Sequence, residues 1–299
     1  MSDSRRVYRA IKQAMKQLYP TEPQGHLARH LDTLAFMVSG IVLSQSCQLP
    51  KIASKVPGDV HPDSRTKQMS RWVQNEHITL GLYFLPFVQP LLAGLAAARP
   101  LVFIMDGSTV ARGCLTRMVS LLYGKRALPI AWLVVEGVKG HFPAATHVAL
   151  VRELRALVPA TARAVFLGDG EFDSPELQAE VNGYGWGYVC RTAKNIQIGV
   201  GDEWLRIAEQ FVAELKVQRG QREFRKRALF TQAAYGPVTV IAWWEARYDE
   251  PIYLVSNLTS VAAACRWYQK RMCIETFLRA DSASLTQPNI DRTASASLT

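Results

Sequence analysis

Two apolar runs that each end in an aspartate constrain the fold of this chain more than any other feature. Residues 101–106 (LVFIMD) and 162–169 (ARAVFLGD) are largely apolar up to the final acid. Such runs are typical of strands that a sheet buries on both faces, here with a carboxylate at the tip. The sequence therefore predicts an α/β fold.

The elements around these two runs complete the predicted core. Their order is three strands, a helix, a strand, a helix and a strand, which indicates a three-strand meander followed by strands that return through helices. Ser174 and Pro175 are typical of the N-cap and first position of a helix, and Gly183 lies near its end. The further strands are expected at 118–124, 128–137 and 187–191, and the helices at 146–157 and 174–184.

Changes in composition along the chain predict five regions. The tail is rich in Ser, Ala and Thr and has no apolar period, so it offers too little apolar surface to offset the entropy of ordering it. The regions are a helical region at 1–98, a first part of the core at 99–194, a β-rich and basic insertion at 195–258, a core helix at 259–280 and a disordered tail at 281–299.

One uncharged stretch has the length of a membrane span. Residues 80–98 contain no charged side chain, and about 20 apolar residues suffice to cross a bilayer. However, Pro86 and Pro90 would break a lone spanning helix. We therefore expect a buried helix-turn-helix segment and no membrane partner.

Charge and cysteine content bear on the partner and the compartment. The chain has 35 Lys and Arg against 25 Asp and Glu, a formal net charge of +10. Such an excess favours a polyanion, although charge alone leaves the partner open. The five cysteines contain no Cys-x-x-Cys pair and indicate neither a disulfide framework nor a zinc site. With basic, polar residues in place of a signal peptide at 1–20, they predict a cytoplasmic protein.

A basic segment near the end of the helical region has two interpretations. Residues 64–78 place Arg65, Lys67 and Arg71 on a helix that follows a short helix and a turn. This arrangement resembles a helix-turn-helix DNA reader. The alternative is an ordinary solvated helix face with Trp72 packed inward.

The two strand-end aspartates are candidate metal ligands. Asp106 is followed by Gly107, and Asp169 lies between Gly168 and Gly170, so the backbone leaves room for an ion or a phosphate. Carboxylate oxygens are the ligands that Mg²⁺ and Mn²⁺ prefer. The alternative is a pair of turn-forming Asp-Gly dipeptides.

A third acid is presented by the predicted helix at 259–280. Tyr268, Arg271 and Glu275 follow Tyr-x-x-Arg-x-x-x-Glu spacing and would share one face of a helix. Arg271 could then contact a phosphate, while Glu275 reaches an ion held by the two aspartates. Tyr268 could donate a hydrogen bond to a nucleic-acid backbone.

These residues resemble the bacterial DDE transposases of the insertion-sequence-four type. The resemblance runs from about Asp32 to Arg279, and its motifs are FIMDGSTV with Asp106, VFLGDGEFD with Asp169, YVCR with Arg191, and YQKRMCIETFLR. It implies a ribonuclease-H-like mixed sheet, a β-rich domain inserted between the second aspartate and the glutamate, and an amino-terminal helical DNA-binding region.

The resemblance also implies a reaction and its partners. Asp106, Asp169 and Glu275 would hold two Mg²⁺ or Mn²⁺ ions about 4 Å apart for phosphoryl transfer, and Arg191, Arg271 and Tyr268 would contact DNA. The partners would be double-stranded DNA, as terminal inverted repeats and target DNA, and a second copy of the chain in a synaptic homodimer. The candidates for stacking on a flipped base are Trp243, Trp244 and Tyr253.

The motif pattern departs from the family after Arg279. The family has a Lys seven residues after its glutamate, and this chain has Ser282. A truncation or frame change in the gene would produce this pattern, so we expect weak or absent strand cleavage. Two alternatives stay open. A ribonuclease-H-like nuclease would share the carboxylates without needing the Tyr-x-x-Arg-x-x-x-Glu spacing, and a non-catalytic remnant would bind terminal repeats without cutting them.

Overall fold

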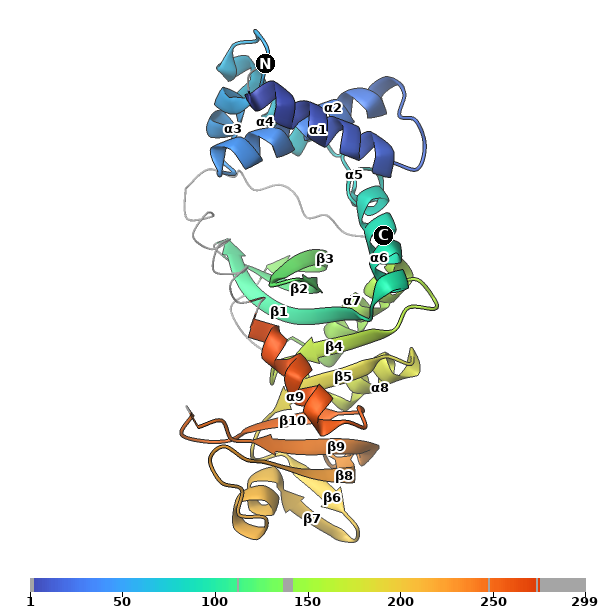
Figure 1. Cartoon of the computed structure of the whole chain (residues 1–299), viewed down its shortest axis with the longest axis vertical. Coiled ribbons are helices and arrows are strands. Elements are labelled where there is room, and N and C mark those ends of the chain that lie inside the picture. The colour runs from blue at the N-terminus through green and yellow to red at the C-terminus, as the bar shows by residue number, and fades with distance from the viewer. Residues whose placement is uncertain (1–2, 112, 137–141, 247, 273, 275–299) are drawn as a thin grey trace. The chain divides into compact units, whose positions relative to one another are not determined.

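The computed structural model describes residues 3–111, 113–136, 142–246, 248–272 and 274 (Figure 1). The described residues form two compact units, one ending at Gly94 and the other beginning at Leu95. The first unit is helical, and the second is built on a large mixed sheet with helices, in agreement with the predicted α/β class.

The helical unit lies within residues 1–98, the region that the sequence predicts to be helical. The helix of the basic segment is shorter than expected, because the Asn75 side chain accepts the amide of His77 and so ends helical hydrogen bonding. The helices are α1 (Asp3–Leu18), α2 (Gly25–Ser44), α3 (Leu49–Lys55), α4 (Pro62–Val73), α5 (Leu80–Tyr83) and the start of α6 (Leu85–Ala98).

Apolar side chains of α2 hold this unit together. Met37 packs with residues of α3 and α4, and Leu31 packs with Tyr19 and Tyr83. Gly40 permits a close approach of α3, because a methyl group at this position would lie 2.5 Å from Ile52 Cγ2 and 2.8 Å from the Ile52 carbonyl oxygen. The contact between α2 and α3 therefore requires glycine.

The uncharged stretch at 80–98 forms α5 and α6 instead of one continuous helix. Pro90 lies inside α6, and three apolar side chains of that helix are buried. Within the described ranges, α2 is the one helix that is long and apolar enough to cross a membrane by length and composition.

Ten strands form one sheet in the second unit, in the order β3-β2-β1-β4-β5-β10-β9-β8-β6-β7. β1, β4 and β5 are parallel neighbours, and the remaining pairs are antiparallel. The strands are β1 (Leu101–Ala111), β2 (Cys114–Tyr123), β3 (Arg126–Glu136), β4 (Ala164–Gly168), β5 (Gly187–Thr192), β6 (Gln197–Val200), β7 (Glu203–Arg206), β8 (Arg222–Phe230), β9 (Tyr235–Trp243) and β10 (Ile252–Ser256).

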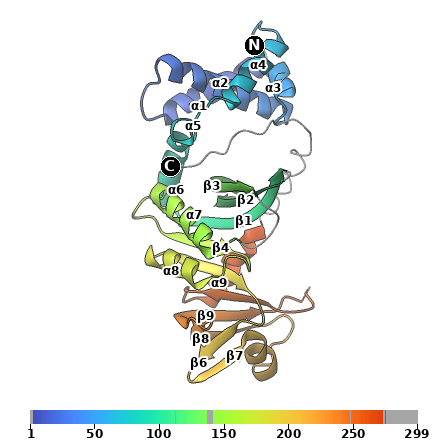
Figure 2. The ribbon, with the colours of Figure 1, turned by 180° about the vertical axis from the view of Figure 1, so that it is seen from behind.

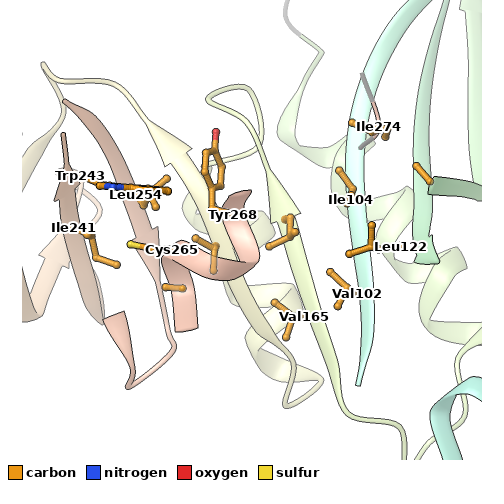
Figure 3. Close-up of a cluster of buried hydrophobic side chains, with 14 residues drawn as sticks. Val102, Ile104, Leu122, Val165, Ile241, Trp243, Leu254, Cys265, Tyr268 and Ile274 are labelled. Carbon is orange, nitrogen blue, oxygen red and sulfur yellow. The ribbon is translucent and has the colours of Figure 1, made fainter. Parts of the chain in front are cut away.

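Helices cover both faces of this sheet. α7 (Ala144–Leu157) and α8 (Pro175–Gly183) lie on one face, and α9 (Val261–Gln269) lies on the other, as the two opposite views show (Figures 1 and 2). Ile104, Leu167 and Val189 belong to one buried cluster with Cys265 and Tyr268 of α9. Figure 3 labels Ile104, Cys265 and Tyr268 in this cluster. Side chains alternate along a strand, so every second residue of β1, β4 and β5 faces α9.

Most of the core elements lie where the sequence predicts them. All five residues of β4 are buried, as expected for a strand covered on both faces. Ser174 caps α8 by accepting a hydrogen bond from the Leu177 amide. The strands at residues 195–258 extend the same sheet, because β10 pairs antiparallel with β5.

Two elements differ from expectation. β1 does not end at Asp106 but continues to Ala111, because it pairs with β2 beyond the point where its pairing with β4 ends. Among the described residues, the predicted core helix at 259–280 is also interrupted. α9 ends at Gln269 and a 3₁₀ turn follows at Lys270–Met272, where the Lys270 amide donates to the Trp267 and Tyr268 carbonyls.

We expect Gly40→Ala to destabilise the protein by about 1–3 kcal/mol, because the added methyl group would overlap the backbone of α3. Gly94→Ala in α6 is the matched control. A methyl group at residue 94 meets no atom within 4 Å, so this change should be neutral or stabilise by up to about 1 kcal/mol. Urea unfolding of both variants measures the difference, and equal midpoints would refute the packing argument.

Candidate active site

Asp106 and Asp169 lie at the same end of the sheet because β1 and β4 pair in parallel. The pairing runs from Leu101 opposite Ala164 to Ile104 opposite Leu167. Each aspartate lies two residues beyond the last pair, Asp106 still within β1 and Asp169 in the loop after β4. The alternation of side chains directs both toward the α9 face. Both aspartates follow the end of this pairing, and both carboxylates interact electrostatically with the Arg271 guanidinium.

Arg191 extends this row across a third strand. β4 and β5 pair with Leu167 opposite Val189, which places Arg191 beside Asp169 on the same face. The Arg191 side chain is exposed. Asp106, Asp169 and Arg191 thus form a row of two acids and one base across β1, β4 and β5.

The end of α9 and the turn after it bring Tyr268 and Arg271 to this row. Arg271 Nη1 lies 3.6 Å from Asp106 Oδ2, and the guanidinium lies 5.7 Å from the centre of the Tyr268 ring. Arg271 is only 8% exposed. A buried cation is tolerated where opposite charges compensate for its lost hydration.

Ionisation at this site reflects the same neighbours. Burial raises the pKa of Tyr268, although the charges of Arg271 and Arg191 act to lower it. Burial acts to lower the pKa of Arg271, but the interactions with Tyr268, Asp106 and Asp169 outweigh it and raise the pKa. Arg271 therefore stays protonated beside the two acids.

Backbone amides orient the two carboxylates. The Gly107 amide donates to Asp106 Oδ1 at 2.8 Å, and the Glu171 amide donates to Asp169 Oδ1 at 3.0 Å. Carboxylates on adjacent strands suit a pair of divalent ions about 4 Å apart. Over the described part of the chain, no group of three His, Cys, Asp or Glu residues has metal-binding spacing. Glu275, the expected third ligand, lies outside the described residues, so these residues fit two of the three expected ligands.

The loop after β4 holds acids that the sequence reasoning did not single out. Burial raises the pKa of Asp173, and the charge of Asp169 adds to this effect. Burial also raises the pKa of the Cys190 thiol, again with the charges of Asp173 and Asp169. The signal was present as alternate acids in the run DGEFD, where Glu171 also lies. Arg117 on β2, which pairs with Glu171, had no comparable signal.

The helical unit presents the three basic residues of α4 differently. Arg65 is buried and donates to the Val56 and Pro57 carbonyl oxygens, so it closes the turn between α3 and α4. Its guanidinium is not available to a phosphate, contrary to expectation. Lys67 and Arg71 are exposed. Arg71 also lines a groove of about 550 Å³ between α2 and α4, together with Arg29.

The three aromatic candidates for base stacking have unequal exposure. Trp243 is buried in the cluster under α9, with the Arg222 guanidinium 4.9 Å from its ring centre. Tyr253 is buried near Phe211. Trp244 is partly exposed and donates from Nε1 to the Tyr248 carbonyl at 3.0 Å. Trp243 and Tyr253 thus serve the packing of the sheet in this structure.

Comparisons with known proteins find no match by sequence and only low-scoring similarities among solved structures. No protein-family model and no curated protein matches the sequence. A piggyBac transposase synaptic complex with hairpin DNA is 11% identical with a TM-score of 0.49, over 93% of this chain and 66% of that one.

Two endonucleases are also similar. Ciona intestinalis Endonuclease V in complex with inosine-containing DNA is 11% identical with a TM-score of 0.37, over 63% of this chain and 88% of that one. The catalytic domain of human Endonuclease V is 15% identical with a TM-score of 0.37, over 67% and 98%. At these identities and scores, the three similarities say nothing about activity.

We expect Arg65→Ala to destabilise the helical unit by about 1–3 kcal/mol, because it leaves two carbonyl oxygens without their donor. Lys67→Ala, on the same helix and exposed, should change stability by less than about 0.5 kcal/mol. Thermal unfolding followed by circular dichroism measures both. An Arg65→Ala variant as stable as the parent would show that the guanidinium has no structural role.

Proposed function

We propose that this chain is a metal-dependent DNA transposase of the DDE, insertion-sequence-four type. The observation that supports this most is the convergence of Asp106, Asp169 and Arg191 with Tyr268 and Arg271, although about one hundred residues separate Asp169 from α9. The Tyr-x-x-Arg pair favours a transposase over a nuclease that cuts without joining, because such a nuclease has no need of that spacing.

The acidic residues and the arginines of the site have distinct roles in this proposal. Asp106 and Asp169 would bind Mg²⁺ or Mn²⁺, with Glu275 as a third ligand. The two ions, when bound, activate the attacking oxygen and stabilise the leaving oxygen of a phosphodiester. Arg271 and Arg191 would neutralise phosphate charge near the scissile bond, as guanidinium groups suit phosphate oxygens.

The α9 face of the sheet also offers a surface for DNA. Arg222 lies opposite Trp243 on the neighbouring strand, and Phe224 lies opposite Ile241, so both face α9. Lys226 Nζ lies 5.6 Å from the centre of the Phe224 ring, which places it on this face as well. Phe224 is 42% exposed, and both cations are exposed. Cations and an exposed ring suit phosphates and bases.

The substrates and assembly follow from the proposed reaction. The chain would act on the terminal inverted repeats of its own element and on target DNA, in the cytoplasm of a bacterium. Two copies would join the two ends of the element in a synaptic homodimer.

The first test is metal-dependent cleavage of DNA that carries the terminal repeats flanking the gene. Because this chain departs from the family pattern after Arg279 and we expect its own cleavage to be weak or absent, the parent in this test is the chain with residues 280–299 rebuilt to the family pattern. Asp106→Asn and Asp169→Asn should each reduce cleavage at least about 100-fold, because a metal ligand supplies several kcal/mol of transition-state stabilisation. Asp202→Asn, at an exposed turn, should leave cleavage unchanged. DNA binding by the Asn variants should persist. Cleavage without joining by the parent chain would identify a nuclease, and binding without cleavage would identify a DNA-binding remnant.

A second test concerns the DNA surface. Replacing both Arg222 and Lys226 by Gln should reduce the slope of log affinity against log salt by roughly 1.8 for duplex DNA, since each lost phosphate contact removes about 0.9. Arg225→Gln is the control, because Arg225 lies opposite Val240 and faces away from α9. Fluorescence anisotropy measures the slopes. If Arg225→Gln reduced the slope by as much per charge removed, the α9 face would not be the DNA-binding surface.

A further inference from the structure

Arg117 is a buried cation whose partners connect the two aspartates. It lies on β2 opposite Gly107 of β1 and is only 6% exposed. Its guanidinium pairs with Glu171 and lies 4.1 Å from the centre of the Phe142 ring. Burying an arginine costs free energy of folding unless its charge is paired and hydrogen-bonded. The contacts with Glu171 and Phe142 are therefore those that compensate for the burial of Arg117.

The contacts of Arg117 reach the residues that orient both carboxylates. Gly107 donates its amide to Asp106 Oδ1, and Glu171 donates its amide to Asp169 Oδ1. A methyl group at Gly107 would overlap the Arg117 guanidinium, so the guanidinium rests directly on that backbone. One side chain therefore contacts both of the residues whose amides hold the aspartates.

The sheet itself does not fix the separation of the two carboxylates. Strand pairing between β1 and β4 ends at Ile104 opposite Leu167. Beyond these residues, β1 follows β2, while the chain after β4 leaves the sheet as a loop. The contacts of Arg117 with Gly107 and Glu171 cross this divergence.

We propose that Arg117 and Glu171 are positioning residues that set the separation and orientation of Asp106 and Asp169 for divalent metal binding. This inference rests on the proposed function of the same site. Residues that support metal ligands in this way commonly affect metal affinity as well as rate.

The experiment measures Mn²⁺ binding to the full-length chain, by electron paramagnetic resonance of free Mn²⁺ and by calorimetry. Glu171→Gln keeps the shape of the side chain and removes its charge, and Arg117→Lys keeps the charge and removes the planar guanidinium. Each should weaken Mn²⁺ binding by about 10- to 100-fold. Gly107→Ala, which displaces the guanidinium from the other side, should have the same effect. Cleavage by all three should require correspondingly more metal.

The control is a second Arg–Glu pair in the same unit. Arg152 and Glu180 pair at 2.8 Å on α7 and α8, and Glu180 has a similarly shielded side chain. The hydrogen bond from Arg152 lowers the pKa of Glu180 to about 2, so Glu180 is ionised at neutral pH. Glu180→Gln should leave Mn²⁺ affinity within about twofold of the parent value, well inside the expected effect at the site.

The outcomes separate this inference from the proposed function. A parent chain that binds no Mn²⁺ and cleaves no DNA would overturn both. A parent that binds Mn²⁺, with the affinities of Glu171→Gln and Arg117→Lys unchanged, would overturn only the positioning role, whether or not the parent cleaves DNA. Loss of binding in Glu171→Gln with normal binding in Arg117→Lys and Gly107→Ala would instead make Glu171 a direct metal ligand. An equal loss in Glu180→Gln would mean that the effect is one of general stability.

Discussion

The parallel pairing of β1 with β4 is the constraint on which the rest of the second unit depends. Both strands are covered on two faces, so their paired positions up to Ile104 and Leu167 carry apolar side chains. The first polar positions on the α9 face come where this pairing ends, and they are Asp106 and Asp169. A slip of one residue between the strands would send one carboxylate to the opposite face of the sheet.

The position of α9 on the sheet depends on packing against the same strands. Cys265 and Tyr268 pack on the apolar residues that precede the two aspartates, which fixes where the helix ends. The 3₁₀ turn then places Arg271 beside Asp106. Because Arg271 is buried, the nearby carboxylates compensate for the lost hydration of its charge, and its charge in turn stabilises the two ionised acids. The apolar cluster and the charged row therefore support each other, although the sequence separates them widely.

The sequence was sufficient to predict an element where the same physical cause, such as burial on both faces of a sheet, produces both the residue pattern and the structure. Unbroken apolar runs predicted β1 and β4, since only burial on two faces selects such runs. The sequence was insufficient where the structure of a residue or strand depends on a contact with another part of the chain. Arg65 has the spacing of a DNA-contacting residue, but the carbonyl oxygens that bind it lie in the turn before α4. Likewise, the extension of β1 depends on β2, and the isolated cation Arg117 gives no sign of its contact with Glu171.

Three buried arginines show why burial alone does not identify a functional residue. Arg65 donates hydrogen bonds to backbone carbonyl oxygens, so its guanidinium stabilises the turn between α3 and α4. Arg117 pairs with Glu171, one step removed from Asp169. Arg271 faces Asp106 itself across 3.6 Å, a separation longer than a direct hydrogen bond. Within the second unit, Arg271 interacts with the charges of both aspartates, whereas Arg117 acts on Asp169 through Glu171.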